Sequence, residues 1–400
     1  MRASVGIIAG ILLIDVILIG AISHLRAEEG WVGLATVIWA SLMAIWCAVT
    51  DRIVAWGKKE EEERLTGRPE TRHTLKEWIG ILTATIILIV YIIIAMFFTA
   101  TLILRARDAG LAMDGRRYSV DGGKYKVHLA CVGEPRGSTG KNRTPTILLE
   151  APQDPVETDF EHWAYSSYQN GTISRYCYWD RPGYAWSDCA PSPHSAGMSA
   201  DALSEALTLA GEQGPWIVVA AGYGSIVSRI FSARHLNDVK GMLLIDPLHE
   251  DLLDRVASAL KGFRLWGWGV LSPVGFRRVI GALFEGKTPN DRIYGDAVDT
   301  NDKYIKARLQ ENLVADSITK NEVESANTIQ GSGLPFAIIS SGLHTRKDRE
   351  WQKKQEALTK LTDNLVAWDV VKEAPSHVWQ AYEGRRIMEK RLKQLVKRAN

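Results

Sequence analysis

The segment 215–229 has the pattern of a nucleophile elbow, in which a buried strand runs through a sharp turn into a helix. In such an elbow, small residues flank a serine because the backbones of the strand and the helix must approach closely. Ala220 and Gly224 provide the small residues, but the residue at the apex of the turn is Gly222. The spacing therefore predicts an elbow whose attacking hydroxyl group is missing.

The elements around this turn alternate between strands and helices. A helical pattern covers 199–212, and Gly214-Pro215 ends it before the strand of the elbow begins. Short β-type runs occupy 124–132, 146–150, 174–179, 216–221, 241–245 and 335–340. This alternation predicts an α/β fold with a mostly parallel sheet covered by helices, and functional residues at the carboxyl ends of the strands.

Three motifs resemble one group of α/β-hydrolase-fold proteins. They are Asp180-Arg-Pro-Gly-Tyr-Ala-Trp-Ser187, the elbow, and Leu244-Ile-Asp-Pro-Leu-His249. The resemblance covers roughly 118–395, and at the elbow the family's Gly-His-Ser becomes Ala220-Ala221-Gly222. With its three amino-terminal hydrophobic segments, the chain is similar to fungal membrane-anchored members that are labelled mitochondrial integral membrane proteins. The resemblance implies an α/β-hydrolase fold with a helical cap insertion.

The resemblance also implies where the rest of a catalytic triad would lie. His377 stands at the position of the family's base, and Asp246 closes a strand where some families place the acid. Asp348, in a later loop, is the alternative acid. Ser225 is the alternative nucleophile, although its place on the first turn of the following helix should direct its side chain along that helix.

The region expected to stabilise an oxyanion is altered as well. Ala151 and Pro152 occupy the loop after the third strand, where many of these enzymes have a glycine-rich turn, and Tyr223 adjoins the apex. Pro152 has no backbone N–H to donate. Because loss of one triad member alone costs several orders of magnitude in rate, changes in two parts of the machinery argue against ordinary ester hydrolysis.

These observations favour a catalytically inactive relative that binds or scaffolds an apolar ligand or a partner. An active esterase or lipase-like hydrolase that uses Ser225 is the alternative, and a structural subunit of a membrane complex is a third hypothesis. We expect Asp180 and Arg181 to form a structural ion pair in their turn. The His and Cys spacings predict no metal site, no cofactor motif is present, and a formal net charge of +2 gives no reason to expect nucleic-acid binding.

The first quarter of the chain predicts a membrane anchor. Apolar segments at 6–23, 32–50 and 79–104 are long enough to cross a bilayer, and a charged loop at 51–78 separates the last two. Asp15 lies inside the first span, where an ionisable group needs a polar contact or a partner helix. We therefore expect a membrane anchor at 1–110 and a hydrolase-like domain at 111–400, with a cap insertion at about 250–330.

Loop charges and cysteines bear on the compartment. Basic residues gather in 51–78, which places this loop and the amino terminus on one side of the membrane and the hydrolase-like domain on the other. That side would be non-cytosolic or the intermembrane space; the resemblance favours the mitochondrial inner membrane, with an endomembrane as the alternative. Cys177 and Cys189 flank the Asp180 loop and could form a disulfide or remain buried thiols. Asn170-Gly-Thr172 is a glycosylation acceptor if the domain is lumenal.

The expected cap is rich in aromatic and basic residues over 252–284. Such a composition suits a helix that lies at a membrane interface, and it equally suits an ordinary lid over the sheet. Both interpretations predict a hydrophobic pocket beneath the insertion.

Overall fold

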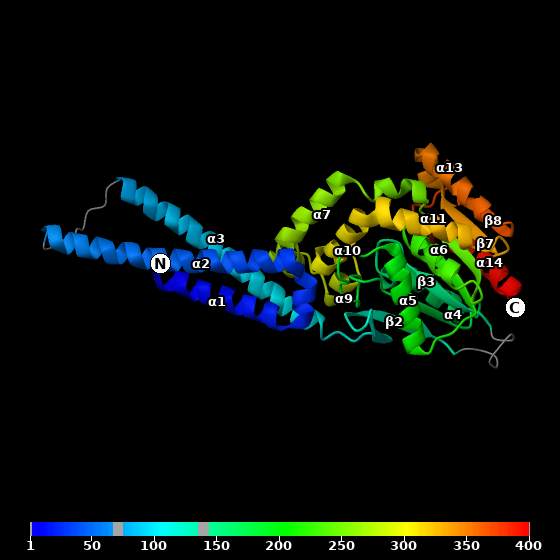
Figure 1. The fold of residues 1–400 in the computed structure, drawn as a ribbon, viewed down its shortest axis with the longest axis horizontal. Helices are drawn as coiled ribbons and strands as arrows, with labels where there is room; N and C mark the ends of the chain where they lie inside the picture. Colours follow the sequence, from blue (N-terminus) through cyan, green and yellow to red (C-terminus); the bar gives the residue numbers. More distant parts are fainter. Residues whose placement is uncertain (1, 67–74, 135–143, 400) are drawn as a thin grey trace. The chain divides into compact units, whose positions relative to one another are not determined.

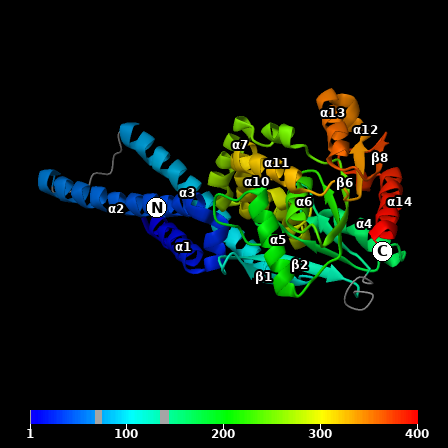
Figure 2. The same ribbon diagram turned by 45° about the vertical axis from the view of Figure 1, so that its right-hand side comes forward.

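The computed structural model describes residues 2–66, 75–134 and 144–399. The chain divides into two compact units, which are coloured along the sequence in Figures 1 and 2. The membrane unit comprises residues 1–111, 267–292 and 300–302, and the sheet unit comprises 112–266, 293–299 and 303–400.

The membrane unit contains three long helices, α1 (Arg2–Ala21), α2 (Ser23–Thr66) and α3 (Leu75–Asp108). Each is long and apolar enough to cross a membrane, over Ser4–Ala21, Gly33–Gly57 and Trp78–Asp108. These stretches overlap the three predicted spans. Part of the predicted charged loop, residues 67–74, lies outside the described residues.

Asp15 is buried among these helices. Its carboxylate accepts a hydrogen bond from the Thr99 hydroxyl at 3.1 Å, and Leu12, Ile19 and Phe98 are buried in the same unit. The polar contact expected for an ionisable group inside a span is therefore present: Thr99 of α3 provides it to Asp15 of α1.

Part of the expected cap belongs to the membrane unit. Helix α8 (Phe276–Phe284) follows a 3₁₀ turn in which the Val274 carbonyl accepts from the Thr101 hydroxyl at 3.3 Å. The rings of Phe97 and Phe276 lie 5.2 Å apart, and Arg292 forms an ion pair with Asp108. The segment 267–292 is thus built against α3, and the insertion is divided between the two units.

The sheet unit is organised by one eight-stranded sheet with the order β1-β2-β4-β3-β5-β6-β7-β8. Strands β1 and β4 pair antiparallel with β2, and every other pair is parallel. This order is that of the α/β-hydrolase fold, as predicted. The strands are β1 (Arg116–Val120), β2 (Tyr125–Val132), β3 (Thr146–Glu150), β4 (Tyr176–Trp179), β5 (Trp216–Ala221), β6 (Val239–Ile245), β7 (Phe336–Ser341) and β8 (Leu365–Val371).

Helices cover both faces of the sheet because the central strands are apolar on both sides (Figure 1). One face packs against α5 (Ala196–Ala210), α6 (Gly224–Arg234), α11 (Lys320–Ile329) and α13 (Arg349–Leu358), and the other against α4 (Phe160–Gln169) and α14 (Tyr382–Ala399). The remaining helices are α7 (Ala259–Leu271), α9 (Pro289–Ile293), α10 (Asp302–Val314) and α12 (Gly342–Lys347). Alternate residues of β5 illustrate the two faces, since Val218 belongs to the first core and Val219 to the second.

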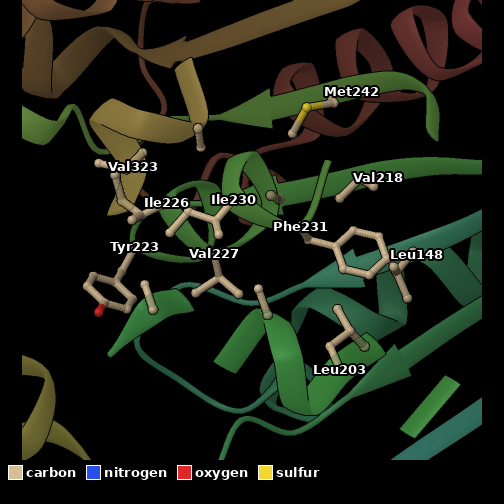
Figure 3. Close-up of a cluster of buried hydrophobic side chains, with 14 of the residues drawn as sticks. Leu148, Leu203, Val218, Tyr223, Ile226, Val227, Ile230, Phe231, Met242 and Val323 are labelled. Carbon is tan, nitrogen blue, oxygen red and sulfur yellow. The ribbon is translucent and has the colours of Figure 1, made fainter. Parts of the chain in front are cut away.

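Figure 3 shows how α6 is fixed on the first face. Its apolar side chains Ile226, Val227, Ile230 and Phe231 lie among Leu148 of β3, Val218 of β5 and Met242 of β6. These side chains are buried, so the start of α6 and the turn before it have little freedom to move.

One disulfide is present in the sheet unit, and its pairing differs from the one we considered. Cys177 is joined to Cys131, its direct cross-strand neighbour in the β2–β4 ladder, and not to Cys189. Cys189 is buried, and its thiol lies 3.8 Å from the Lys303 carbonyl oxygen. The sequence shows which cysteines flank a loop but not which strands are neighbours.

Candidate functional site

The elbow has the expected backbone conformation. Gly222 has φ +49°, and its amide donates to the Ile245 carbonyl at the end of β6 at 3.1 Å. A β-carbon added at this position would lie 3.0 Å from the Pro152 β-carbon. The left-handed turn of a nucleophile elbow is therefore retained, and a side chain at position 222 would crowd Pro152.

The small frame around the apex has a steric cause. A β-carbon on Gly224 would lie 2.2 Å from the Ala151 carbonyl oxygen and 2.8 Å from the Glu150 Cγ. Helix α6 thus begins directly against the loop that follows β3, and only glycine fits between them.

Ser225, the alternative nucleophile, is fully buried. Its hydroxyl donates to the Gly222 carbonyl at 2.7 Å and accepts from the Leu248 amide at 3.1 Å. These bonds tie the elbow to the loop after β6. The partners of the Ser225 hydroxyl are therefore backbone groups, and His377 is not among them.

Arg181 lies across the region where an oxyanion would be held. Its guanidinium donates to the Ala151 carbonyl at 2.7 Å and also to the Pro152 carbonyl. It forms ion pairs with Glu150 at 2.7 Å and with Glu311 of α10 at 3.3 Å. The loop after β3 therefore presents carbonyl oxygens to a cation, whereas an oxyanion hole requires N–H groups.

Glu150 ends β3 inside this network. It accepts from Arg181 and from the Trp179 indole, and it is 2% exposed. Burial opposes its ionisation more strongly than Arg181 favours it, which raises the pKa of Glu150 to about 7. This carboxyl group therefore titrates near neutral pH.

Helix α10 contributes the rest of the network. Glu311 accepts from Tyr184 at 2.9 Å and from Gln153 at 3.0 Å, while Tyr304 donates to the Gln153 carbonyl at 2.9 Å. Arg308 in turn donates to the Tyr304 hydroxyl at 2.7 Å. The space in front of the elbow is thus filled by ionic and phenolic side chains. The hydrophobic pocket predicted beneath the insertion is present elsewhere, as a mostly apolar groove of about 620 Å³ between α7 and α10 that is lined by Phe263, Trp266 and Leu309 among others. Sequence analysis missed Glu311 because nothing in its local pattern distinguishes it from a surface carboxylate.

Tyr223 follows the apex and joins the same network. Its ring is 3% exposed and lies 5.4 Å from the Arg181 guanidinium, which also lies 4.6 Å from the Tyr184 ring. Figure 3 shows its hydroxyl at the edge of the hydrophobic cluster, pointing away from α6. Tyr223 thus contributes a bulky aromatic ring beside the elbow, packed face-on against a cation.

His377 lies close to this end of the sheet, but Asp154 is its partner. Its Nε2 atom lies 3.4 Å from a carboxylate oxygen of Asp154, and this contact raises the pKa of His377. The two residues line a cavity of about 30 Å³ together with Pro152 and Trp379. That volume holds roughly one water molecule.

Asp246 has a different histidine as its partner. It accepts from His344 Nδ1 at 3.0 Å, from the Trp351 indole at 3.1 Å and from the Ser341 amide at 3.1 Å. The hydrogen bond from His344 raises the pKa of that histidine. The base and the acid that we predicted are therefore each paired elsewhere: Asp246 with His344, and His377 with Asp154.

Asp348, the alternative acid, caps a helix. It accepts from the amides of Glu350 and Trp351 at 3.0 and 3.1 Å and pairs with Arg255, which lowers the pKa of Asp348. None of these contacts involves His377. Its position at the start of α13 is a typical one for an N-cap aspartate.

The ion pair predicted between Asp180 and Arg181 is wrong. Asp180 contacts His128 Nδ1 at 2.7 Å, whereas Arg181 binds Glu150 and Glu311. Side chains of consecutive residues on an extended segment point in opposite directions, so Asp180 and Arg181 face different parts of the molecule although they are adjacent in sequence.

A family model and two uncharacterized fungal proteins are similar to the chain. Residues 1–131 match a family model described as a region of unknown function (DUF2417). An uncharacterized protein of Schizosaccharomyces pombe is 34% identical over 99% of this chain and 78% of its own length. An uncharacterized vacuolar membrane protein of Saccharomyces cerevisiae is 25% identical, over 76% of this chain and 55% of its own length. The mitochondrial location favoured by resemblance is therefore not supported.

Among solved structures, an esterase from Exiguobacterium antarcticum is similar to the chain. The match has a TM-score of 0.49 and 13% identity, and it covers 71% of this chain and 99% of the esterase. The fold assignment itself rests on the strand order of the sheet. Because this chain is 34% identical to the Schizosaccharomyces pombe protein over 99% of its residues, it belongs to the family of that protein.

Proposed function

We propose that the chain is a membrane-anchored pseudo-hydrolase, whose sheet unit acts as a non-catalytic scaffold for a partner. One observation carries the proposal: Arg181, Glu150 and Glu311 form a buried network at the site where substrate would meet the elbow, and Gly222 offers no hydroxyl. Ordinary acyl transfer needs both the nucleophile and the oxyanion donors. The loss of both favours a structural role for the fold.

The alternative, hydrolysis through Ser225, gains no support from the contacts of that residue. A serine nucleophile needs a base within hydrogen-bond reach, and the Ser225 hydroxyl is bonded to backbone groups on both sides.

A fluorophosphonate probe tests the proposal directly. The full chain in detergent should remain unlabelled under conditions in which an active esterase is labelled completely. Labelling of the wild-type chain that disappears in Ser225→Ala would overturn the proposal. Ser228→Ala is the matched control, because Ser228 is another buried serine of α6.

We place the protein in the membrane of the vacuole or a related compartment, with the sheet unit on the lumenal side. The name of the Saccharomyces cerevisiae relative supports the membrane, and the Cys131–Cys177 disulfide supports an oxidising side. Asn170 is exposed at the end of α4, where a glycan could be attached. We expect the chain from a fungal host to shift on a gel after endoglycosidase treatment, and Asn170→Gln to abolish the shift. An unglycosylated chain would speak against the lumenal side.

A further inference from the structure

Three side chains of metal-ligand type meet in the sheet unit away from the elbow. His128 comes from β2, Asp180 follows β4, and Glu157 lies in the short helical turn Val156–Thr158. The His128 Nδ1 atom lies 2.7 Å from an Asp180 oxygen and 3.6 Å from a Glu157 oxygen. One ligand atom of each residue lies within 4.8 Å of the other two. The residues are separated by more than twenty positions, so no short motif reveals the cluster.

The other ring nitrogen of His128 fixes the orientation of the imidazole. Its Nε2 atom lies 2.6 Å from the carbonyl oxygen of Asp114, which can only accept a hydrogen bond. Nε2 therefore carries a hydrogen, and Nδ1 faces the two carboxylates, where it donates to Asp180 when protonated and offers a lone pair to a cation when it is not. Metal-binding histidines typically donate their second N–H to a carbonyl or carboxylate in this way.

The two carboxylates are short of compensating donors. Within the described part of the chain, Asp180 Oδ1 and both oxygens of Glu157 have no hydrogen-bond partner, and Asp180 is 1% exposed. Buried carboxylates of this kind require either extra protons or a cation.

We propose that His128, Glu157 and Asp180 bind a divalent transition metal of the Zn²⁺ class. One imidazole nitrogen and two carboxylate oxygens make a ligand set that suits Zn²⁺, with a fourth position for water or a second carboxylate oxygen. Ligand bonds of about 2.0–2.1 Å imply ligand separations of about 3.3 Å, so His128 and Asp180 move apart by roughly half an ångström.

Such a metal would be structural. It would link β2 and the end of β4 to the segment after β3, which also carries Pro152 and Asp154. Because this bond set joins segments that are distant in sequence, its contribution would appear as resistance to unfolding.

Metal content of the purified full chain provides the first test. We expect about one equivalent of Zn²⁺ per wild-type chain and less than a tenth of that in Asp180→Asn and Glu157→Gln. Glu161→Gln is the matched control, since Glu161 lies one turn away and accepts from Tyr176 instead. Retention of the metal in both cluster variants would refute the assignment.

Thermal unfolding of the wild type provides a second test that does not depend on the variants folding. A strong chelator should lower the Tm by several degrees, and added ZnCl₂ should restore it, whereas MnCl₂ at the same concentration should restore it less. A Tm that is indifferent to chelator and to both salts, with no bound metal, would show that protons alone hold the cluster together. Full recovery with MnCl₂ alone would overturn the choice of Zn²⁺.

Discussion

The carboxyl end of the sheet and the bundle of membrane helices differ in what fills them. Around the elbow, Arg181 and Glu311 occupy the expected substrate space, and the cavity beside His377 holds only about 30 Å³. Among the helices α1, α2 and α3, a groove of about 280 Å³ is mostly apolar. It is lined by Val5, Ile8, Ala44, Cys47, Thr50, Asp51, Val54, Ala84, Ile87, Leu88 and Tyr91.

The contrast shows that a chain can keep the strand order and turn of a hydrolase without keeping space for a ligand at the elbow. The sheet end keeps the left-handed turn at Gly222, but charged side chains fill the volume around it. An apolar ligand therefore has no space at the elbow itself, whereas the membrane unit offers this groove and the sheet unit offers the groove of about 620 Å³ beside α7.

The largest effect should come from removing the central cation of the sheet end. Arg181→Met leaves Glu150 and Glu311 buried without their counterion, and we expect a loss of about 3–5 kcal/mol in unfolding free energy. Denaturant unfolding of the full chain in detergent measures it. In the control Arg234→Met, which breaks the exposed pair with Asp201, the loss should be below about 1 kcal/mol. Equal losses would mean that the network is unimportant.

The pH dependence of stability should depend on Glu150. Its pKa is about 7 in the folded chain against 4.5 ordinarily, so the folded state binds the additional proton between these values and stability falls as pH rises from 4.5 to 7. Glu150→Gln should remove about 3 kcal/mol of that fall. Unfolding at pH 4.5 and pH 7 measures it, with Glu356→Gln on an exposed face of α13 as control. An unchanged slope in Glu150→Gln would contradict the assignment.

Restoring the serine should not restore the enzyme. Gly222→Ser combines a positive φ with a β-carbon 3.0 Å from Pro152, so we expect a loss of about 1–3 kcal/mol and no fluorophosphonate labelling. Gly122→Ser has a similar φ of +64° but open space, and it should cost less. Rapid labelling of Gly222→Ser would show that the elbow lacks only its hydroxyl.

The smallest effect should be seen in the membrane unit. If the groove takes up an acyl chain, Ala84→Trp should reduce labelling by a photoactivatable lipid severalfold with little change in Tm. Ile89→Trp on the same helix is the control, because Ile89 is exposed and does not line the groove. Equal labelling of both variants would contradict the hypothesis that the groove binds an acyl chain.

The sequence predicted what is local. The β-branched run of β5, the small residues beside Gly222 and the helical pattern of α5 each lie within a few neighbours of one another. Their hydrogen bonds and packing follow from short-range periodicity, and the three apolar helices follow from length alone.

The partners of charged side chains were not predictable in this way. Asp154 and His377 are more than two hundred residues apart, and Arg181 and Glu311 are 130 residues apart. Each pairing depends on which loops the finished sheet brings together. Asp246 directly follows β6, and His377 lies six residues after β8. The family order of triad residues could not indicate that Asp246 would pair with His344.

The division of the insertion has a practical consequence. The chain passes from one unit to the other at residues 111, 266, 292, 299 and 302, so a single cut cannot release the sheet unit. A shortened chain that begins at residue 112 would still carry 267–292, including Phe276 and Arg292, after the loss of their α3 partners Phe97 and Asp108. Protein of that kind should aggregate when expressed alone, and biochemistry on this molecule will need detergent or lipid from the first step.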